Sequence, residues 1–427
     1  MLSKIFERAV HEQMKHYLDK RGILFGHQSG FRGKFSTDTC LIDLSDFLRT
    51  EMSKGNLIGM ICIDLQKAFD TVHHGTLLEK LKAIGVSDSA LSWFSSYLSC
   101  RRQCVEVDGC RSEFMDVTCG VPQGSILGPQ LFLIYINDMY SCLECRLSLY
   151  ADDSALFMAH KDASFIANQL SIELSKCRKW LIDNKLSLHM GKTESLLFGT
   201  RKRLKSVLNY QVFCDGTAIK QVQSFRYLGV KLDSSMSGEA HAREVIGKCN
   251  GRLSFLHRYS SLLDEQTKRI LCSSLIQPLV DYCCSSWYTG LPMILKKRFE
   301  VLQRRMVRFI FCYDSRAHVD SANLKVMSWM LVSDRVAFFK LLHVFKIKHA
   351  LAPSYLSERF TAVEQTHAYN TRSRGRNFSI SSSNSCSLTT FSYSAAKLWN
   401  DLPIHLKEIE SLSCFRRRLR DFILQSY

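Results

Sequence analysis

The chain has 427 residues, of which 46% are hydrophobic, and it carries 57 Lys and Arg against 40 Asp and Glu. This composition excludes an intrinsically disordered chain, and the length suggests two to three domains of about 150 residues each. The formal net charge of +17 produces self-repulsion that a polyanionic partner usually offsets. The charge therefore favours a nucleic acid or an acidic membrane as partner, with a generally basic, soluble surface as the alternative.

Seventeen cysteines are scattered along the chain, many among apolar neighbours, as in Ile61-Cys62-Ile63. No apolar leader follows the charged N-terminal residues, so we expect buried free thiols in a reducing, intracellular compartment, nuclear or cytoplasmic. Cys142 and Cys145 have no second pair at zinc spacing, and we expect no zinc site there. No run of 18 apolar residues occurs, which predicts no transmembrane helix. Of the two partners that the charge allows, we expect a nucleic acid and no membrane.

The first 140 residues alternate between helical and strand-like patterns. The nearly continuous apolar run 57–63 suits a strand that is buried on both faces. Helices are predicted over 3–21, 39–53, 75–84 and 88–99, followed by a hairpin at Asp108-Gly109 and a Gly/Pro-rich loop at 120–129 that leads into a helix ending near 139.

The remainder changes from mixed to helical patterning. Strand-like stretches at 146–151 and 154–158 flank Asp152-Asp153, which places this acidic pair at a hairpin tip. A helix over 162–184, two further hairpins, a helical region from about 238, a loosely ordered connector at 365–395 and a final basic helix at 415–424 are predicted after it.

Three carboxylates stand out by their placement, because Asp64 ends the buried strand and Asp152 and Asp153 lie between two apolar arms. Carboxylates that converge repel one another unless a positive charge compensates them. Two Mg²⁺ ions, with Mn²⁺ as an alternative, would compensate them and suit phosphoryl transfer. A single Asp at a turn is more often a residue that bonds backbone amides. The combination with Asp64 in a basic chain favours the metal site.

The loop 120–129 (GVPQGSILGP) holds three glycines and two prolines in ten residues. Its bends are therefore fixed, and its backbone can approach a ligand closely. Gln123 supplies an amide that both donates and accepts hydrogen bonds. Taken alone, the loop is best explained as an ordinary Gly/Pro loop that starts a helix.

Together these segments resemble the polymerase region of reverse transcriptases from non-LTR (LINE-type, jockey-like) retrotransposons. The likeness runs in order and spacing from residue 3 to about 235, and six ordered motifs make it specific. They are 28–33 (QSGFRG), 61–70 (ICIDLQKAFD), 120–129, 150–153 (YADD), 184–193 (NKLSLHMGKT) and 225–230 (FRYLGV).

The resemblance implies an α+β fold of the right-hand polymerase type. It implies partial fingers at 1–56, a palm with an antiparallel sheet and helices on one face at 57–235, and a helical thumb at 236–345. A mostly helical C-terminal region with a connector and a basic tail would follow at 346–427. The implied function is an RNA-directed DNA polymerase that extends a DNA primer with dNTPs on an RNA template.

The resemblance also implies roles for individual residues. Asp64, Asp152 and Asp153 would bind the metal ions. Phe69 would exclude a 2′-hydroxyl by its ring, or is simply a core aromatic. Lys192 would protonate the leaving pyrophosphate, or is a solvated lysine. Arg32 would touch the triphosphate. The remaining substrate-binding residues would be Gln123, Gly124, Tyr150 and Ala151.

The sequence departs from the pattern of this family in two respects, and two alternative functions therefore stay open. The chain begins inside the fingers and has no room for an endonuclease domain ahead of the polymerase, so we expect a truncated or partial reading frame. A non-catalytic remnant that binds RNA or DNA is one alternative. An RNA-dependent RNA polymerase is the other, because Asp70 lies where such enzymes place an acidic residue.

Basic residues recur among the apolar residues of 238–345, as expected for a helical thumb along a nucleic-acid backbone. An amphipathic bundle with a solvated basic side is the alternative. The cations of this pattern are Arg243, Lys248, Arg252, Arg258, Lys268, Lys296, Lys297, Arg298, Arg304, Arg305 and Arg308.

Overall fold

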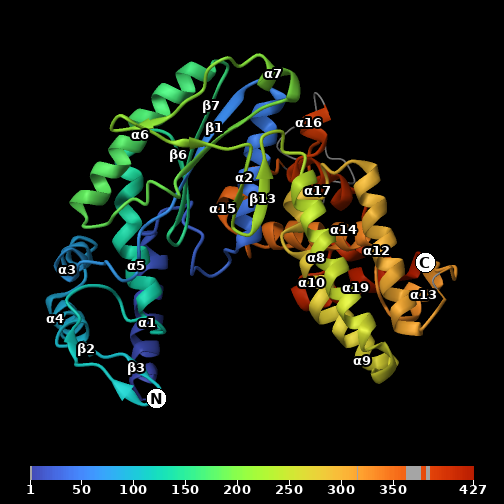
Figure 1. The fold of residues 1–427 in the computed structure, drawn as a ribbon, viewed down its shortest axis with the longest axis horizontal. Coiled ribbons are helices and arrows are strands. Elements are labelled where there is room, and N and C mark those ends of the chain that lie inside the picture. Colours follow the sequence, from blue (N-terminus) through green and yellow to red (C-terminus); the bar gives the residue numbers. More distant parts are fainter. Residues whose placement is uncertain (1, 315, 362–376, 381–384) are drawn as a thin grey trace. The chain divides into compact units, whose positions relative to one another are not determined.

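The computed structural model describes residues 2–314, 316–361, 377–380 and 385–427. The chain divides into two compact units, each assembled from separate stretches of sequence (Figure 1). Unit 1 comprises Met1–Phe35, Gly59–Leu196 and Val207–Val222, and unit 2 comprises Ser36–Ile58, Leu197–Ser206 and Gln223–Tyr427. The boundaries of fingers, palm and thumb given above stay predictions.

A five-stranded sheet forms the centre of unit 1, with the strand order β11-β8-β1-β7-β6. Strands β6 and β7 form an antiparallel hairpin, whereas the short edge strand β11 pairs parallel with β8. The expected α+β class with an antiparallel hairpin is thus present, with one parallel pair at the edge. The strands are β1 (Leu57–Ile63), β6 (Arg146–Tyr150), β7 (Asp153–His160), β8 (Glu194–Phe198) and β11 (Lys220–Gln221).

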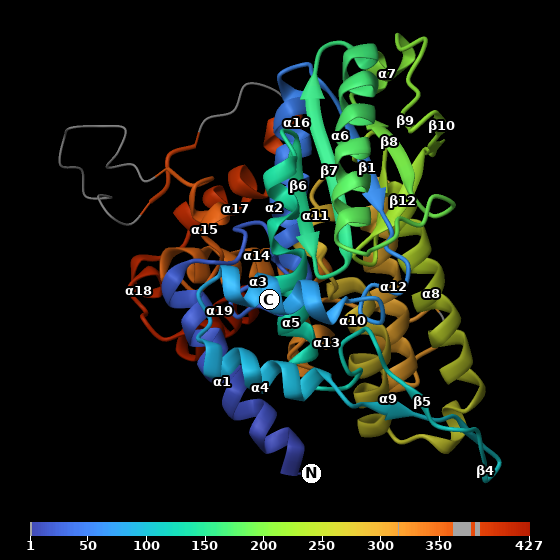
Figure 2. The same cartoon turned by 90° about the vertical axis from the view of Figure 1, so that its left-hand side faces the viewer.

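Strand β1 is buried as its apolar run predicts, with only Cys62 partly exposed. A Cβ atom at Gly59 would lie 2.4 Å from Cγ2 of Ile166, a residue of helix α6 (Ala163–Asp183). Glycine at this position therefore lets the helix approach the strand closely. Helix α6 also packs on β7 (Figure 2). This packing fixes the sheet from which Asp64 and the β6–β7 turn project.

The other elements of unit 1 include an exposed arm of short strands between α4 and α5. The predicted turn at Asp108-Gly109 is confirmed, because both residues have positive φ and connect β3 to β4. The elements are α1 (Leu2–Arg21), α3 (His74–Ala83), α4 (Asp88–Leu98), β2 (Arg102–Gln103), β3 (Glu106–Val107), β4 (Cys110–Arg111), β5 (Met115–Asp116), α5 (Gly128–Ile136), the 3-10 helix η1 (Asn137–Cys142), β9 (Phe213–Cys214) and β10 (Thr217–Ala218).

Unit 2 is largely helical. Helix α2 (Thr37–Ser53) packs against α11, α15, α16 and α17, which lie far from it in the sequence. The described elements are α7 (Arg201–Lys205), β12 (Ser224–Tyr227), β13 (Val230–Asp233), α8 (Glu239–Arg258), η2 (Ser260–Leu262), α9 (Glu265–Leu271), the π-helix η3 (Cys272–Ile276), α10 (Gln277–Asp281), α11 (Cys284–Trp287), α12 (Met293–Phe311), α13 (Ser321–Val326), α14 (Val332–Lys348), α15 (Ser354–Ser357), α16 (Ser385–Leu388), α17 (Phe391–Asn400), α18 (Ile404–Lys407) and α19 (Leu412–Gln425).

Polar side chains of α2 tie the C-terminal helices of unit 2 to it. Asp46 is fully buried and accepts hydrogen bonds from the backbone N–H groups of Phe391 and Ser392 at the start of α17. Asp43 pairs with Arg359, and Asp38 lies 2.7 Å from the Nε2 atom of His343. The C-terminal segments are therefore anchored parts of unit 2.

Two expectations need correction. Within the predicted loose connector 365–395, residues 365–376 and 381–384 lie outside the described residues, but α16 and the start of α17 are helical. Buried thiols were also expected, yet Cys100, Cys110, Cys119 and Cys312 are exposed. Cys100, Cys110 and Cys119 have polar or glycine neighbours, and Cys312 is the C-cap residue of α12. Among the described helices, none has the length and apolarity that a bilayer-spanning helix requires.

Candidate active site

Asp64 lies directly after β1, where the chain pairs with the segment around His189. The backbone N–H of His189 donates to the carbonyl oxygen of Asp64 at 2.8 Å, and that of Gln66 donates to Ser187 at 2.9 Å. This pairing brings Lys192 to the carboxylate, with 3.7 Å between its Nζ atom and Oδ2 of Asp64. The lysine side chain is 65% exposed, so the contact is open to solvent.

The acidic hairpin tip is a two-residue turn. Tyr150 pairs with Asp153, which leaves Ala151 and Asp152 at the turn, and Ala151 has a positive φ of 57°. A turn of this kind is tight, and non-glycine residues rarely adopt this conformation without outside support. Asp152 therefore projects from a fixed backbone, while Asp153 is the first residue of β7.

Gln28 supplies that support from behind the turn. Its side chain is buried, and its Oε1 atom accepts hydrogen bonds from the N–H groups of Ala151 at 3.0 Å and Gly30 at 2.9 Å. A Cβ atom at Gly30 would lie only 2.4 Å from the nitrogen of Ala151, which explains the glycine. The sequence motif 28–33 was noticed, but this positioning role of Gln28 was missed. Burial of a polar amide gives no signal in a single sequence.

The three carboxylates interact electrostatically. The pKa of Asp153 is raised, first because its carboxyl is partly desolvated and then because the charges of Asp152 and Asp64 lie nearby. Lys192 is the cation that contacts Asp64 in this cluster. In the described part of the chain, no three His, Cys, Asp or Glu side chains already form a metal-binding group. Convergence of the carboxylates within metal-bridging reach stays a prediction.

The Gly/Pro loop lies against the segment that follows Asp64. The backbone N–H of Val121 donates to the carbonyl of Phe69 at 2.9 Å, and a Cβ atom at Gly120 would lie 2.7 Å from the carbonyl oxygen of Asp70. The Nε2 atom of Gln123 donates to Oδ1 of Asp70 at 2.8 Å. Gly124 has a φ of 75°, with open space where a Cβ atom would lie. The structure thus brings Gln123 and Gly124 to the same segment as Phe69.

Phe69 is half-buried between two aromatic neighbours. Its ring stacks on the buried Phe132 of α5 with 4.4 Å between ring centroids, and it meets Phe31 edge-on at 6.2 Å. One face is therefore packed against the core, while part of the ring stays accessible. This geometry is compatible with both readings of the residue, as a core aromatic and as a sugar-facing wall.

Arg32 is held by its own loop. Its Nη1 atom donates to the carbonyl oxygens of Phe25 at 2.8 Å and Gln28 at 3.0 Å, and its guanidinium lies over the ring of Phe35 at 4.2 Å. These contacts order the stretch that carries Gln28. A contact of Arg32 with a triphosphate stays a prediction.

Glu7 is a second positioning residue that the sequence reasoning missed. Its Oε2 atom accepts from the N–H groups of Ile126 at 2.6 Å and Leu127 at 3.4 Å, just before helix α5. A carboxylate at this place suits the positive end of the helix. A signal existed, because Glu7 lies at helical spacing from the buried Met14 and Leu18.

Several cations of the basic pattern in 238–345 have partners within unit 2. Arg243 and Lys248 form ion pairs with Glu239 and Glu244, and Lys268 is buried. Further cations bond to neighbouring oxygens, namely Arg252 to Leu275, Lys296 to Thr289, Arg305 to Asn250 and Arg308 to Ala317. Acidic and carbonyl partners are thus interleaved with the cations, and a contact of this helical face with a nucleic-acid backbone stays a prediction.

The sequence profile of the family described as "Reverse transcriptase (RNA-dependent DNA polymerase)" matches residues 1–232, more than half of the chain. The chain therefore belongs to the reverse transcriptase family. All the residues of the carboxylate cluster and the Gly/Pro loop lie within the matched range.

Comparison with curated proteins indicates which kind of reverse transcriptase this chain resembles. The chain is 29% identical over 324 residues to a probable RNA-directed DNA polymerase from transposon BS of Drosophila melanogaster, a match that covers 72% of this chain and 35% of that protein. It is 28% identical to the RNA-directed DNA polymerase from mobile element jockey of Drosophila funebris, covering 72% and 34%. The resemblance to enzymes of non-LTR retrotransposons is thus confirmed. The chain spans about a third of the length of these relatives.

Solved structures give a more distant likeness. Telomerase from Candida tropicalis, in complex with a fragment of telomeric RNA, matches with 13% identity and a TM-score of 0.40. That match covers 77% of this chain and 56% of the telomerase chain.

Proposed function

We propose that this chain is the RNA-directed DNA polymerase region of a non-LTR retrotransposon. It would extend the 3′-hydroxyl of a DNA primer with dNTPs on an RNA template. The observation that carries the proposal is the cluster of Asp64, Asp152 and Asp153, in which partial desolvation, and then repulsion by the other two carboxylates, raises the pKa of Asp153. Family membership and the curated relatives support it.

The donor set fits a divalent metal ion of the Mg²⁺ type. Three carboxylates with one exposed lysine nearby have more negative charge than their protein surroundings offset. Hard oxygen ligands are what Mg²⁺ prefers, and Mn²⁺ accepts the same set. When bound, such ions supply charge stabilisation during nucleotidyl transfer. Asp64, Asp152 and Asp153 are the residues that would hold them.

The other residues would orient the substrate. The half-exposed ring of Phe69 would exclude a 2′-hydroxyl, and Gln123 and Gly124 would face the nucleotide or its template base. Tyr150 and Ala151 would shape the floor of the site through the tight turn at Asp152. Lys192 would donate a proton to the leaving pyrophosphate, and its Nζ atom, which lies 3.7 Å from Asp64, supports that role.

The assignment of regions follows from the same proposal. Residues 1–56 would belong to partial fingers, 57–235 to the palm, 236–345 to the thumb and 346–427 to a C-terminal region. The helical content of unit 2 supports a helical thumb. The two compact units divide the chain differently, because residues 36–58 group with the later helices. The predicted fingers region 1–56 is therefore divided between the two units just before α2 begins.

The RNA-dependent RNA polymerase alternative needs Asp70 to contact the 2′-hydroxyl of an incoming nucleotide. The Oδ1 atom of Asp70 accepts a hydrogen bond from Nε2 of Gln123 at 2.8 Å. This bond favours a role of Asp70 in positioning the Gly/Pro loop over a role in binding the 2′-hydroxyl. We therefore place DNA synthesis first.

Primer extension separates the three candidates. The chain is given an RNA template, a DNA primer and Mg²⁺, with either dNTPs or rNTPs, and product length is followed. The proposal expects extension with dNTPs and little with rNTPs. Preferential use of rNTPs would identify an RNA polymerase. Binding of the template–primer without any extension, even when an upstream fingers segment of a relative is supplied, would identify a non-catalytic remnant.

A further inference from the structure

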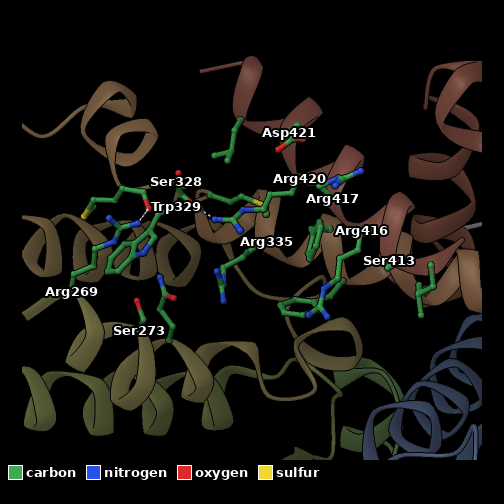
Figure 3. A pocket seen from close by; sticks show the side chains of 17 residues that line it. Arg269, Ser273, Ser328, Trp329, Arg335, Ser413, Arg416, Arg417, Arg420 and Asp421 are labelled. Atoms are coloured by element: carbon green, nitrogen blue, oxygen red, sulfur yellow. Dashed lines mark hydrogen bonds between the residues drawn. The ribbon is translucent and has the colours of Figure 1, made fainter. Parts of the chain in front are cut away.

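A cavity of about 1050 Å³ lies within unit 2, away from the residues of the carboxylate cluster in the sequence (Figure 3). It is bounded by α9, α14, α19 and the segment 327–330. Ligand pockets in proteins usually measure about 300–1,000 Å³, so this cavity is large enough for more than one small group. Five arginines line it against a single carboxylate, Asp421, and they are Arg269, Arg335, Arg416, Arg417 and Arg420.

Three of these arginines build the wall of the cavity. Arg335 forms an ion pair with Asp281 through two of its nitrogen atoms. Arg269 donates to the carbonyl of Met327 at 2.7 Å, and Arg420 donates to that of Ser328 at 3.0 Å, so both hold the segment 327–330 in place. Figure 3 shows these two bonds on the same side of the cavity.

The other two arginines are available to a ligand. Arg416 and Arg417 are exposed on α19, and neither bonds to any residue in the part of the chain that the structure describes. Their helix is nevertheless fixed, because Phe415 stacks on Phe345 of α14 with 4.4 Å between ring centroids. The hydroxyl of Tyr427 also accepts from the N–H of Leu331 at 2.6 Å. Two free guanidinium groups are thus presented on a rigid frame.

An aromatic ring lies among these cations. Phe339 of α14 is half-exposed and lines the cavity, with the guanidinium carbon of Arg335 5.9 Å from its ring centroid. A guanidinium pair matches a phosphate or a carboxylate equally well. A ring beside the pair favours a ligand that carries both phosphates and flat bases, because bases stack on aromatic side chains.

We propose that this Arg-lined cavity binds single-stranded nucleic acid. Arg416 and Arg417 contact successive phosphates, and Phe339 stacks with a base of the same strand. The site goes beyond the proposed polymerase function, because it would hold a strand through unit 2 and not through the carboxylate cluster. Asp421 repels the backbone locally, and the excess of arginines over this one carboxylate outweighs it.

The test compares two double variants that remove the same charge. Arg416→Ala/Arg417→Ala acts inside the cavity. Arg418→Ala/Lys397→Ala removes two exposed cations of the same unit that do not line it. The measurement is fluorescence anisotropy of a labelled 12-nucleotide RNA, with excess unlabelled template–primer duplex to occupy the polymerase site. Affinity is measured over a range of salt concentrations.

We expect the cavity variant to bind the RNA roughly tenfold more weakly and to lower the slope of log affinity against log salt by about 1.4, since each phosphate contact on a single strand contributes about 0.7. The control variant should change affinity less than about twofold. Phe339→Leu should weaken binding without changing the salt slope. An equal effect of both double variants would overturn the proposal in favour of a general surface charge. Competition by AMP or by a poly-glutamate peptide as strong as that by unlabelled RNA would also overturn it.

Failure here is distinguishable from failure of the polymerase proposal. Primer extension on a short pre-annealed template should be unchanged in the cavity variant. Unchanged extension together with unchanged RNA affinity would remove the cavity site alone. Loss of extension in the wild type with the expected RNA affinities would remove the polymerase function alone.

Discussion

Each unit contains a set of three aspartates, and the two sets differ in whether their charges are compensated by partners. In unit 2, Asp38, Asp43 and Asp46 follow one another along α2, and each is met by a partner, either a histidine, an arginine or a pair of backbone N–H groups. In unit 1, the charges of Asp152 and Asp64 act on Asp153, and Lys192 lies 3.7 Å from Asp64 as a solvent-exposed counter-charge. The first set fixes structure, whereas the second keeps its repulsion.

That difference separates structural from functional charge. Removing a buried carboxylate from its donors leaves them unsatisfied, so the α2 set contributes to stability. A cluster that retains repulsion costs stability and persists where function requires it. The predictions below test this division, from the largest expected effect to the smallest.

Asp152→Asn should abolish Mg²⁺-dependent primer extension, a loss of at least about 10³-fold, because the amide cannot replace a charged metal ligand. Template–primer affinity should change little, since phosphate contacts of basic residues carry most of it. The measurement is single-turnover extension beside a binding titration. Asp108→Asn, at an exposed turn of the same unit, is the matched control and should keep activity. A large loss of affinity in Asp152→Asn would contradict this division of labour.

Asp46→Ala should lower the free energy of unfolding by roughly 3 kcal/mol, because two backbone N–H groups at the start of α17 lose their buried acceptor. Chemical denaturation followed by circular dichroism measures it. Asp43→Ala should cost less, since its partner Arg359 is partly exposed and can be hydrated. Equal and negligible effects of both substitutions would show that α2 does not anchor the C-terminal helices.

Phe69→Ala should relax discrimination against rNTPs, because its half-exposed ring would otherwise fill the space of a 2′-hydroxyl. Some loss of stability is expected too, as the stacking on Phe132 is removed, but less than the about 3–5 kcal/mol of a fully buried phenylalanine. The measurement is the ratio of dNTP to rNTP incorporation. Phe31→Ala, which removes an exposed neighbouring ring, should leave that ratio unchanged. Equal loss with both sugars would make Phe69 a core residue only.

Asp153→Asn should slightly raise thermal stability at pH 7.5. The folded state raises the pKa of this carboxyl, so its ionised form is disfavoured by folding above that pKa. The gain should shrink as the pH falls through the raised pKa towards about 4, where the wild-type carboxyl is about half protonated in the unfolded state and more so in the folded state. Melting temperatures of both proteins at pH 7.5 and pH 4 provide the test. A variant less stable than the wild type at pH 7.5 would mean that the charge is compensated.

Much of the fold was predictable from local pattern. The apolar run of β1 and the Asp108-Gly109 turn lie where periodicity and turn chemistry place them, and the family match covers the motifs that carried the resemblance. The packing of α2 against the C-terminal helices in one unit was not predictable. Contacts between residues more than 300 positions apart leave no periodic signal in the sequence. The ion pairs of Arg243 with Glu239 and of Lys248 with Glu244 span only four positions along α8, so the sequence carried a signal for them that we did not use.

The candidate site likewise has features that local sequence predicts and features that depend on contacts distant in the sequence. The positions of Asp64 after a strand and of Asp152 and Asp153 at a hairpin turn were predicted from local features and are confirmed. The supports behind them did not, since Gln28 reaches the Ala151 turn across 123 positions and Glu7 reaches Ile126 across 119. Side chains that position a site depend on tertiary packing, and one sequence carries that information only as an oddly polar residue on an apolar face.

The most direct test of the account is whether the carboxylates of unit 1 bind a divalent ion. Thermal unfolding of the wild type is compared with that of Asp64→Asn/Asp152→Asn, with 10 mM MnCl₂ or with NaCl of equal ionic strength, in the presence of template–primer and a non-hydrolysable dNTP. A ligand that binds only the folded state raises its stability. The account predicts that Mn²⁺ raises the melting temperature of the wild type and not that of the variant. An equal rise in both proteins, or none in either, would contradict it.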